Sequence, residues 1–373
     1  MRIALLTYNI GQNYGGILQA YALMTTLSDL GHSPELLYIK TGSVKGWKRL
    51  IKKYILSKFM GKFAKRESEY KKLHEFVEEK INPKTKPLST KKDFLRVTKN
   101  NYDAYVVGSD QVWRARLFRY IDYAFFGFVE TGDPIFFSYA PSFGVETWDY
   151  TEAETLKFRE QLAKFRAVSV REDSGVELCR KYLNRDATHV LDPTALLDKT
   201  RYLSLLDNSN AADYSGELLT YILDESDEKN KLVDIVSKDL SYDVFKVGSI
   251  NTDSERIEDM VYPSVQSWIE GFNHAKFVIT DSFHGCIFSI LFHKPFIVYG
   301  NRMRGLARFN SVLKMVGLEN RMIASLDDVD PNLWLEEVDW ESVDNKLNVK
   351  RNISFNFLRD ALSGERHQAD EGF

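Results

Sequence analysis

Short apolar runs alternate with segments of helical periodicity over most of the chain. The first apolar run, at residues 3–8, is followed by a glycine-rich turn at 11–16 and by a helical pattern over 17–30 that Gly31 closes. Short apolar runs that alternate with helices are typical of a parallel sheet with helical crossovers. The further strands expected in this half are residues 35–39, 102–107, 135–139 and 167–170.

A polar stretch follows Asp198, and the alternation restarts after it. The elements expected there are strands at 218–223, 243–247, 276–280 and 295–299 and helices at 229–238, 265–273 and about 285–292. The pattern predicts an α/β protein of two doubly wound, Rossmann-like halves, with a ligand in the cleft between them at the carboxyl ends of the strands. The expected domains are 1–207, with an insertion at about 41–100, then 208–335, and a tail at 336–373 whose last residues are expected to be disordered.

Composition narrows the class of protein. The 373 residues are 44% hydrophobic, which suits two domains, and no run of 18 apolar residues exists to span a membrane. The apolar start is too short for a signal peptide. Cys179 and Cys286 are the only cysteines, so we expect a reducing, cytoplasmic compartment without disulfides or a zinc site.

Charge is distributed unevenly. Residues 41–100 hold 18 Lys and Arg against 6 Asp and Glu, a net charge of +12 in a chain whose total is -3. Apolar residues recur there at helical spacing, from Trp47 to Phe63, which predicts an amphipathic basic helix. Such a helix either lies on an anionic leaflet or packs its apolar face on its own domain. Because the aromatic residues follow a helix face, nucleic-acid stacking is disfavoured.

The most informative polar cluster follows the apolar strand at 276–280. Asp281, Ser282 and His284 lie at the turn where the next helix begins, near Gly285. Backbone N–H groups at a helix start bind phosphate or carboxylate, and a histidine beside them donates to an anion or transfers a proton. The alternative is that Ser282 only caps the helix and His284 only packs.

Two further clusters also follow strands. Arg171 comes directly after the run at 167–170 and either holds a carboxylate in the cleft or forms a surface ion pair with Glu172 or Asp173. Asp110 follows the strand at 102–107 and is a candidate base toward a sugar hydroxyl. Trp113 either stacks on a sugar face or belongs to the core.

Two turns offer backbone or charge to a ligand. The glycine-rich turn at 11–16 lets the backbone approach a ligand closely, although a tight turn without a ligand fits equally well. Arg302, Arg304 and Arg308 follow the strand at 295–299, which suits an anionic ligand or a solvated basic turn.

These segments, in this order, resemble the polysaccharide pyruvyl transferase family. The resemblance covers roughly residues 1–320 and is carried by 13–16, 108–110, 169–173, 191–193 and 280–295. It implies a glycosyltransferase-B-like fold of two Rossmann-like domains facing a cleft. It also implies transfer of the enolpyruvyl-derived unit of phosphoenolpyruvate onto two hydroxyls of a sugar, which gives a cyclic ketal and phosphate. Acceptors in such pathways are often attached to a lipid diphosphate at the cytosolic leaflet.

The resemblance also implies roles for residues. Arg171 and His284 would contact phosphoenolpyruvate, with His284 as acid or phosphate-side donor, and Asp110 or Asp281 would be the base. Many members carry an arginine where this chain has Ser282, and we expect Arg304 or Arg308 to replace it. The remaining expected contacts are Ser282 and Gly285 to the donor and Asn13, Tyr14, Gly15, Gly16, Ser109 and Trp113 to the acceptor. No metal or cofactor is expected.

Two other functions fit the same pattern. A nucleotide-sugar glycosyltransferase of this architecture would share the anion site at the helix start but would need an acidic residue on a ribose. A non-catalytic saccharide-binding relative fits the departure at Ser282. A pyruvyl transferase consumes phosphoenolpyruvate, whereas a nucleotide-sugar glycosyltransferase releases a nucleoside diphosphate. A non-catalytic saccharide-binding relative would not bind phosphoenolpyruvate.

Overall fold

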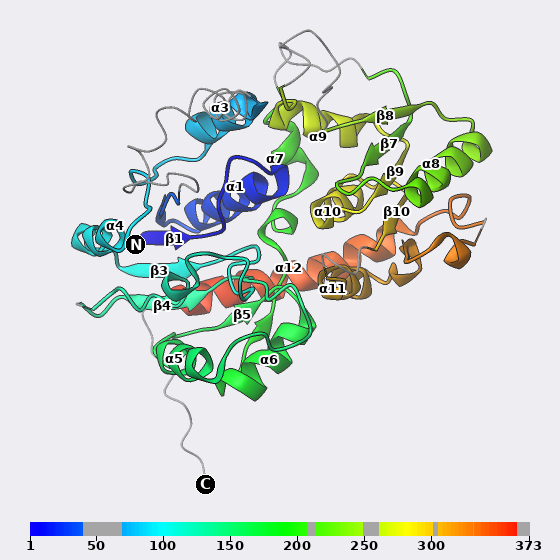
Figure 1. The fold of residues 1–373 in the computed structure, drawn as a ribbon. Coiled ribbons are helices and arrows are strands. Elements are labelled where there is room, and N and C mark those ends of the chain that lie inside the picture. The colour runs from blue at the N-terminus through cyan, green and yellow to red at the C-terminus, as the bar shows by residue number, and fades with distance from the viewer. Residues whose placement is uncertain are drawn as a thin grey trace, which may run out of the picture.

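The computed structural model describes residues 1–39, 69–130, 132–206, 214–248, 261–300, 305–330 and 332–363. The chain forms two parallel sheets that lie beside each other, as Figure 1 shows. The first sheet has the order β2-β1-β3-β4. Its strands are β1 (Arg2–Leu6), β2 (Ser33–Leu36), β3 (Ala104–Val107) and β4 (Ile135–Ser138). A small pair, β5 (Ser169–Val170) and β6 (Thr188–His189), adjoins β4 through a bridge from Phe137 to Ala167.

The second sheet has the order β11-β10-β9-β7-β8. Its strands are β7 (Leu218–Tyr221), β8 (Val244–Lys246), β9 (Phe277–Thr280), β10 (Phe296–Tyr299) and β11 (Met322–Ile323). β1, β3, β7, β9 and β10 are buried along nearly all their length, so their sequences read as continuous apolar runs and not as alternating ones. This is why the sequence predicts these strands well.

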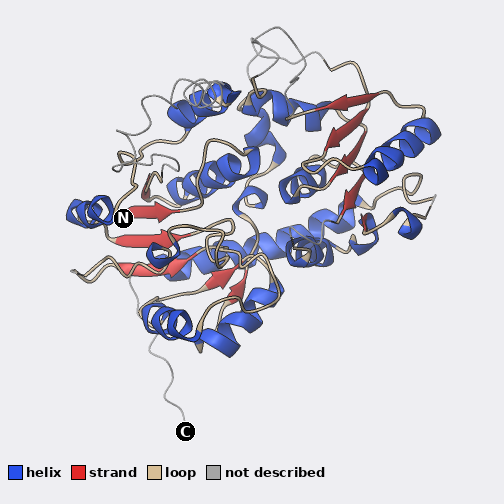
Figure 2. Cartoon of the chain, in the orientation of Figure 1, coloured by secondary structure: helices blue, strands red, loops and turns tan. Residues whose placement is uncertain are grey.

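Helices enclose both sheets, as Figure 2 shows. In the first half they are α1 (Tyr14–Asp29), α3 (Lys71–Lys80), α4 (Lys91–Val97), α5 (Glu152–Leu162), α6 (Asp173–Leu183) and α7 (Lys199–Leu203). In the second half they are α8 (Asp227–Leu240), α9 (Val265–His274), α10 (Phe283–Leu291), α11 (Ala307–Val316) and α12 (Trp340–Leu362). No helix in these described ranges is long and apolar enough to cross a membrane.

The two halves share one apolar cluster, which extends from β1 to α12. Tyr14, at the start of α1, stacks on Trp268 of α9 at 5.5 Å and donates a hydrogen bond to the carbonyl of Pro263. α12 runs back from the second half toward β4 (Figure 1), where Ser354 Oγ accepts from the backbone N–H of Leu191 at 3.0 Å. The first half is therefore in contact with both α9 and α12.

Three helices begin earlier than the sequence predicts, and one of them is α8, which starts at Asp227 and not at 229. α1 starts at Tyr14, and α10 starts at Phe283, because Asn13 and Ser282 cap them and accept from the backbone N–H groups of Gly16 and Gly285. His284 therefore lies in the first turn of α10. Nothing in the sequence analysis assigned a helix to the region of α12.

Several expectations fall outside the described residues. The predicted basic helix, from Trp47 to Phe63, lies in 40–68, the expected start of the second domain at 208 lies in 207–213, and the end of the tail lies in 364–373. These expectations, and the domain limits that rest on them, stay predictions.

Candidate functional site

A cavity of about 760 Å³ opens between the two halves. It lies at the carboxyl ends of β1, β3, β7 and β9, where ligands bind in open parallel sheets. The residues that line it are Tyr8, Asn9, Gln12, Asn13, Gly16, Asp110, Gln111, Arg114, Ala115, Arg116 and Leu117 from the first half and Leu223, Asp281, Ser282, Phe283, His284 and Arg308 from the second. The cavity is where the sequence predicted a ligand.

Two helices begin at this cavity, one from each half. The caps of α1 and α10, Asn13 and Ser282, both line it. Neither helix has an acidic residue in its first turn, so no side chain there neutralises the positive end of the helix dipole. Uncapped backbone N–H groups at such ends favour an anionic ligand.

Gly15 allows the two helix starts to meet. A Cβ atom at this position would lie 2.0 Å from Nδ1 of His284, so only glycine lets the imidazole approach α1. At Gly16 the nearest atom to a Cβ would be 3.8 Å away, an ordinary contact. Gly15 was predicted to contact the acceptor. Because it packs on His284, any effect of Gly15 on the acceptor would be indirect.

Arg171, a predicted donor contact, does not itself line the cavity but lies in a buried ion pair with Asp110, which does. Its Nη1 donates to Oδ2 of Asp192 at 2.8 Å, and its Nη2 lies 3.4 Å from Oδ1 of Asp110. Burial alone would lower the pKa of Arg171, but Asp192, Asp110 and Glu172 together raise it. The surface ion pair considered from the sequence is wrong, because only 2% of the residue is exposed.

Asp192 holds this pair in place. Its Oδ1 accepts from the backbone N–H and the hydroxyl of Thr194, at 2.9 and 2.6 Å. Burial alone would raise the pKa of Asp192, yet His284, Arg171 and the Thr194 hydrogen bonds hold it below the ordinary value. The carboxylate is therefore charged at neutral pH and fixed in orientation.

His284 faces this carboxylate from the second half. Its Nε2 lies 3.8 Å from Oδ2 of Asp192, and 7% of the residue is exposed. Burial lowers the pKa of His284; Asp192 and Asp110 oppose this effect, while Arg171 and Arg308 add to it. The imidazole is therefore neutral at pH 7 in the free protein. It is not enclosed by apolar packing alone, since it borders a cavity with cationic groups.

Arg308 of α11 also lines the cavity. Its guanidinium lies 5.5 Å from the ring centre of Phe283, and that of Arg171 lies 4.6 Å from the same ring. Burial, and then repulsion from Arg171, lower the pKa of Arg308 to about 10, so it stays charged at neutral pH. Arg308 and Ser282 line the same cavity, so this cation is available to a ligand there. Arg302 and Arg304 lie outside the described residues.

The two candidate bases differ sharply in their surroundings. Oδ1 of Asp281 accepts from the backbone of Leu223, and Oδ2 accepts from Asp224 and from Lys229 Nζ at 2.7 Å. This fully buried, paired carboxylate anchors the loop after β7, which argues against the predicted role of Asp281 as base. Asp110 has a left-handed backbone, with φ of 65°, and a part-exposed carboxylate at the cavity.

Two predicted acceptor contacts are wrong. Trp113 is fully buried, stacks on Phe125 at 5.2 Å and donates to the carbonyl of Ala124, so it belongs to the core. Ser109 is also fully buried and donates to the carbonyl of Ala140.

Of the other predicted contacts, three line the cavity and two do not. Asn13, Gly16 and Ser282 line the cavity, although Asn13 and Ser282 also serve as helix caps. Tyr14 and Gly285 do not line it, because Tyr14 packs on α9 and a Cβ at Gly285 would lie 2.3 Å from Thr280 Oγ1.

Some site residues escaped the sequence analysis. Asp192 lies in a segment that carries the family resemblance, but no chemistry was assigned to it. Arg114 and Gln111, which are joined by a hydrogen bond of 2.8 Å, line the cavity on the side of the first half. Their positions four and seven residues before the buried Phe118 offered no signal of a ligand.

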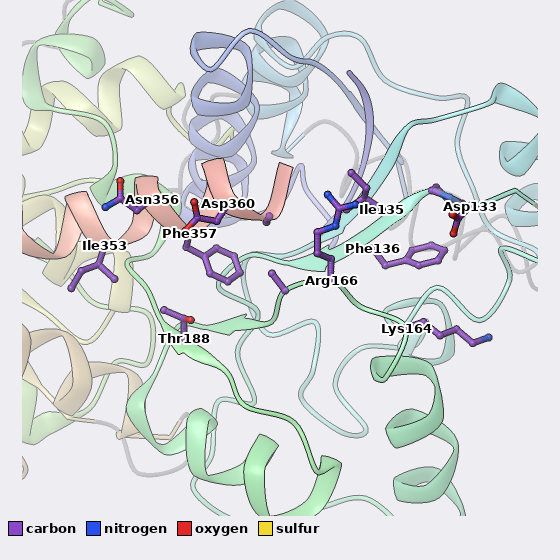
Figure 3. A pocket seen from close by; sticks show the side chains of 13 residues that line it. Asp133, Ile135, Phe136, Lys164, Arg166, Thr188, Ile353, Asn356, Phe357 and Asp360 are labelled. Carbon is purple, nitrogen blue, oxygen red and sulfur yellow. The ribbon is translucent and has the colours of Figure 1, made fainter. Parts of the chain in front are cut away.

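A second cavity, of about 670 Å³, lies away from the helix starts. Figure 3 shows it between β4 and α12, with Phe136, Arg166, Thr188 and Phe357 around it. None of the residues predicted for the site lines this cavity.

The fold is a glycosyltransferase-B-like arrangement of two Rossmann-like halves. The crystal structure of the glycotransferase of kitacinnamycin has a TM-score of 0.50 and 13% identity to this chain, covering 96% of this chain and 97% of the other. The UDP-N-acetylglucosamine 2-epimerase from Rickettsia bellii has a TM-score of 0.50 and 10% identity, covering 98% and 96%. At this identity the likeness shows the fold alone.

The chain belongs to the polysaccharide pyruvyl transferase family, whose model matches residues 13–302. A search of curated protein sequences finds no match. The family confirms the resemblance that the sequence motifs carry.

The contact between Gly15 and His284 gives a prediction. Gly15→Ala should displace the imidazole and destabilise the fold by about 1–3 kcal/mol, as overpacking does. Gly16→Ala, one residue away in the same helix, is the matched control and should leave the histidine signals unmoved. Imidazole NMR spectra and thermal unfolding check both. Unchanged His284 signals in folded Gly15→Ala would contradict the geometry.

Proposed function

We propose that this protein transfers the enolpyruvyl-derived unit of phosphoenolpyruvate onto two hydroxyls of a saccharide and so forms a cyclic ketal in polysaccharide biosynthesis. The observation that carries the proposal is the cavity between the halves, where two helix starts, Arg308 and His284 converge. Phosphoenolpyruvate is a small polyanion, and its carboxylate and phosphate match such donors. Membership of the family supports the same reaction class.

The donor lies, in this proposal, at the start of α10. The free N–H groups of that helix and the guanidinium of Arg308 would bind its oxygens. Arg308 thereby supplies the positive charge that an arginine supplies in many family members at the position of Ser282. Arg171, held beside Phe283, adds positive potential from below.

The reaction needs one proton delivered and two removed. Protonation of the vinyl carbon makes C2 electrophilic, and the first hydroxyl adds there as its proton leaves. Phosphate then departs with the C–O bonding pair, and the second hydroxyl adds to C2 and loses its proton. Of the two hydroxyl protons, one balances the new methyl group and the other leaves with phosphate or to the solvent.

Two side chains are placed for these transfers. His284 serves as acid or as phosphate-side donor, because a bound polyanion raises the pKa of a neighbouring imidazole. Asp110 serves as base, because its carboxylate borders the cavity, whereas that of Asp281 is occupied by Lys229. General acid and base groups of this kind each contribute about 10²–10⁴-fold. The reaction so written uses side chains and backbone groups of this chain.

The direct test is turnover. The protein, phosphoenolpyruvate and a panel of sugar and lipid-linked acceptors are incubated, and phosphate release is measured beside the mass of the acceptor. We expect phosphate release coupled to a matching gain in acceptor mass. Release of a nucleoside diphosphate from nucleotide sugars, without consumption of phosphoenolpyruvate, would contradict the proposal and favour a glycosyltransferase.

Removal of Arg308 tests the donor site. Arg308→Ala should weaken binding of phosphoenolpyruvate about 10- to 100-fold, because a hydrogen bond to a charged group contributes about 1.5–3 kcal/mol. Arg321→Ala removes another buried guanidinium, which donates to the carbonyl of Leu333, and is the control for general destabilisation. If a variant that lacks both Arg304 and Arg308 has an unchanged Michaelis constant for the donor, neither residue replaces the arginine that is absent at position 282.

The charge of residues 41–100 supports peripheral contact with an anionic membrane, where a lipid-linked acceptor would be presented on the cytosolic face. We expect the protein to co-sediment with vesicles that contain anionic lipid and to dissociate as salt rises, since screening weakens surface electrostatics. Binding that is indifferent to both lipid charge and salt would contradict this.

A further inference from the structure

Asp192 occupies the point where the charged groups of the two halves meet. Its side chain is fully buried, and Oδ1 is fixed by two hydrogen bonds from Thr194. The carboxylate therefore cannot rotate without breaking both bonds. Its other oxygen, Oδ2, is left to face the site.

Oδ2 contacts three groups. It accepts from Nη1 of Arg171 at 2.8 Å and lies 3.4 Å from Ser109 Oγ and 3.8 Å from Nε2 of His284. Arg171 belongs to the first half, and His284 belongs to α10 of the second half. One oxygen atom thus faces both the guanidinium and the imidazole across the boundary.

The imidazole supplies a second, independent observation. Nε2 of His284 is buried and makes no hydrogen bond with any residue that the structure describes. A buried polar atom without a partner is costly, and Asp192 is the carboxylate that faces it at 3.8 Å. A small approach of the two halves would convert this separation into a hydrogen bond.

We propose that Asp192 is a positioning residue that orients Arg171 and His284 together, so that the imidazole faces the donor in the cavity while the buried guanidinium adds its positive charge beside it. The inference rests on the proposed function for the identity of that donor. Asp192 itself touches no ligand, because it does not line the cavity. It acts through the two residues that its Oδ2 faces.

The sign of the electrostatic effect follows from the groups around His284. Asp192 and Asp110 favour the protonated imidazole, while burial, Arg171 and Arg308 disfavour it. Asp192→Asn removes one of the two favourable charges and leaves Arg171 without its closest partner. The pKa of His284 should therefore fall further below its ordinary value, and Arg171 should lose its fixed orientation.

The experiment compares wild type, Asp192→Asn, Thr194→Val and Arg321→Met. NMR titration of the imidazole signals, assigned with His284→Gln, reports the pKa of His284 without any ligand. We expect Asp192→Asn to lower it and Thr194→Val, which frees Oδ1 from one hydrogen bond, to lower it less. Arg321→Met should leave it unchanged, even where its unfolding temperature falls.

Phosphoenolpyruvate binding by calorimetry is the second measurement. Asp192→Asn should weaken it roughly tenfold or more, as expected when a charge-assisted contact is lost. Should Asp192→Asn fail to fold, Thr194→Val carries both measurements. Folded variants with the wild-type pKa of His284 and wild-type donor affinity would overturn the proposal. A shifted pKa in a protein that never binds phosphoenolpyruvate would instead support the positioning role and overturn the proposed function.

Discussion

The site depends on the burial of a guanidinium between two parallel sheets. A charge removed from water destabilises a fold unless a partner and further hydrogen bonds compensate it. Arg171 meets this demand through Asp192, and Asp192 meets it through Thr194, so each group fixes the next. The first half therefore presents the fixed Arg171–Asp192 pair to the second half. Phe283 of the second half contacts Arg171, and His284 faces Asp192.

Backbone geometry supplies the rest of the site. α1 and α10 start from opposite halves, and Gly15 lets the histidine of one lie against the first turn of the other. Gly305 makes a comparable approach farther along, where a Cβ would lie 2.0 Å from the carbonyl of Gly144. These close contacts, together with Tyr14 on Trp268, hold both helix starts at the cavity, where their dipoles add to the charge of Arg308. The arrangement suits a small polyanion better than a neutral ligand.

Local pattern predicted the strands, because buried parallel strands are continuous apolar runs, and it predicted that His284 and Arg308 border the cleft. It failed at Ser109 and Trp113, which follow β3 closely but are fully buried in the first half, Ser109 on the carbonyl of Ala140 and Trp113 on Phe125. It also failed where partners are distant in sequence. The donors to Asp281 lie 52 to 58 residues away, and nothing near Asp281 announces them. α12 was missed because it is mostly polar and its contacts with the first half are long-range.

Calorimetric titration of the wild-type protein with phosphoenolpyruvate, beside nucleoside diphosphates at the same pH and salt, tests the central claim most directly. The Arg171–Asp192 pair and the starts of α1 and α10 predict saturable binding of phosphoenolpyruvate that weakens as salt rises. Binding should also take up protons, because His284 becomes protonated. Binding of a nucleoside diphosphate with no binding of phosphoenolpyruvate would contradict the account.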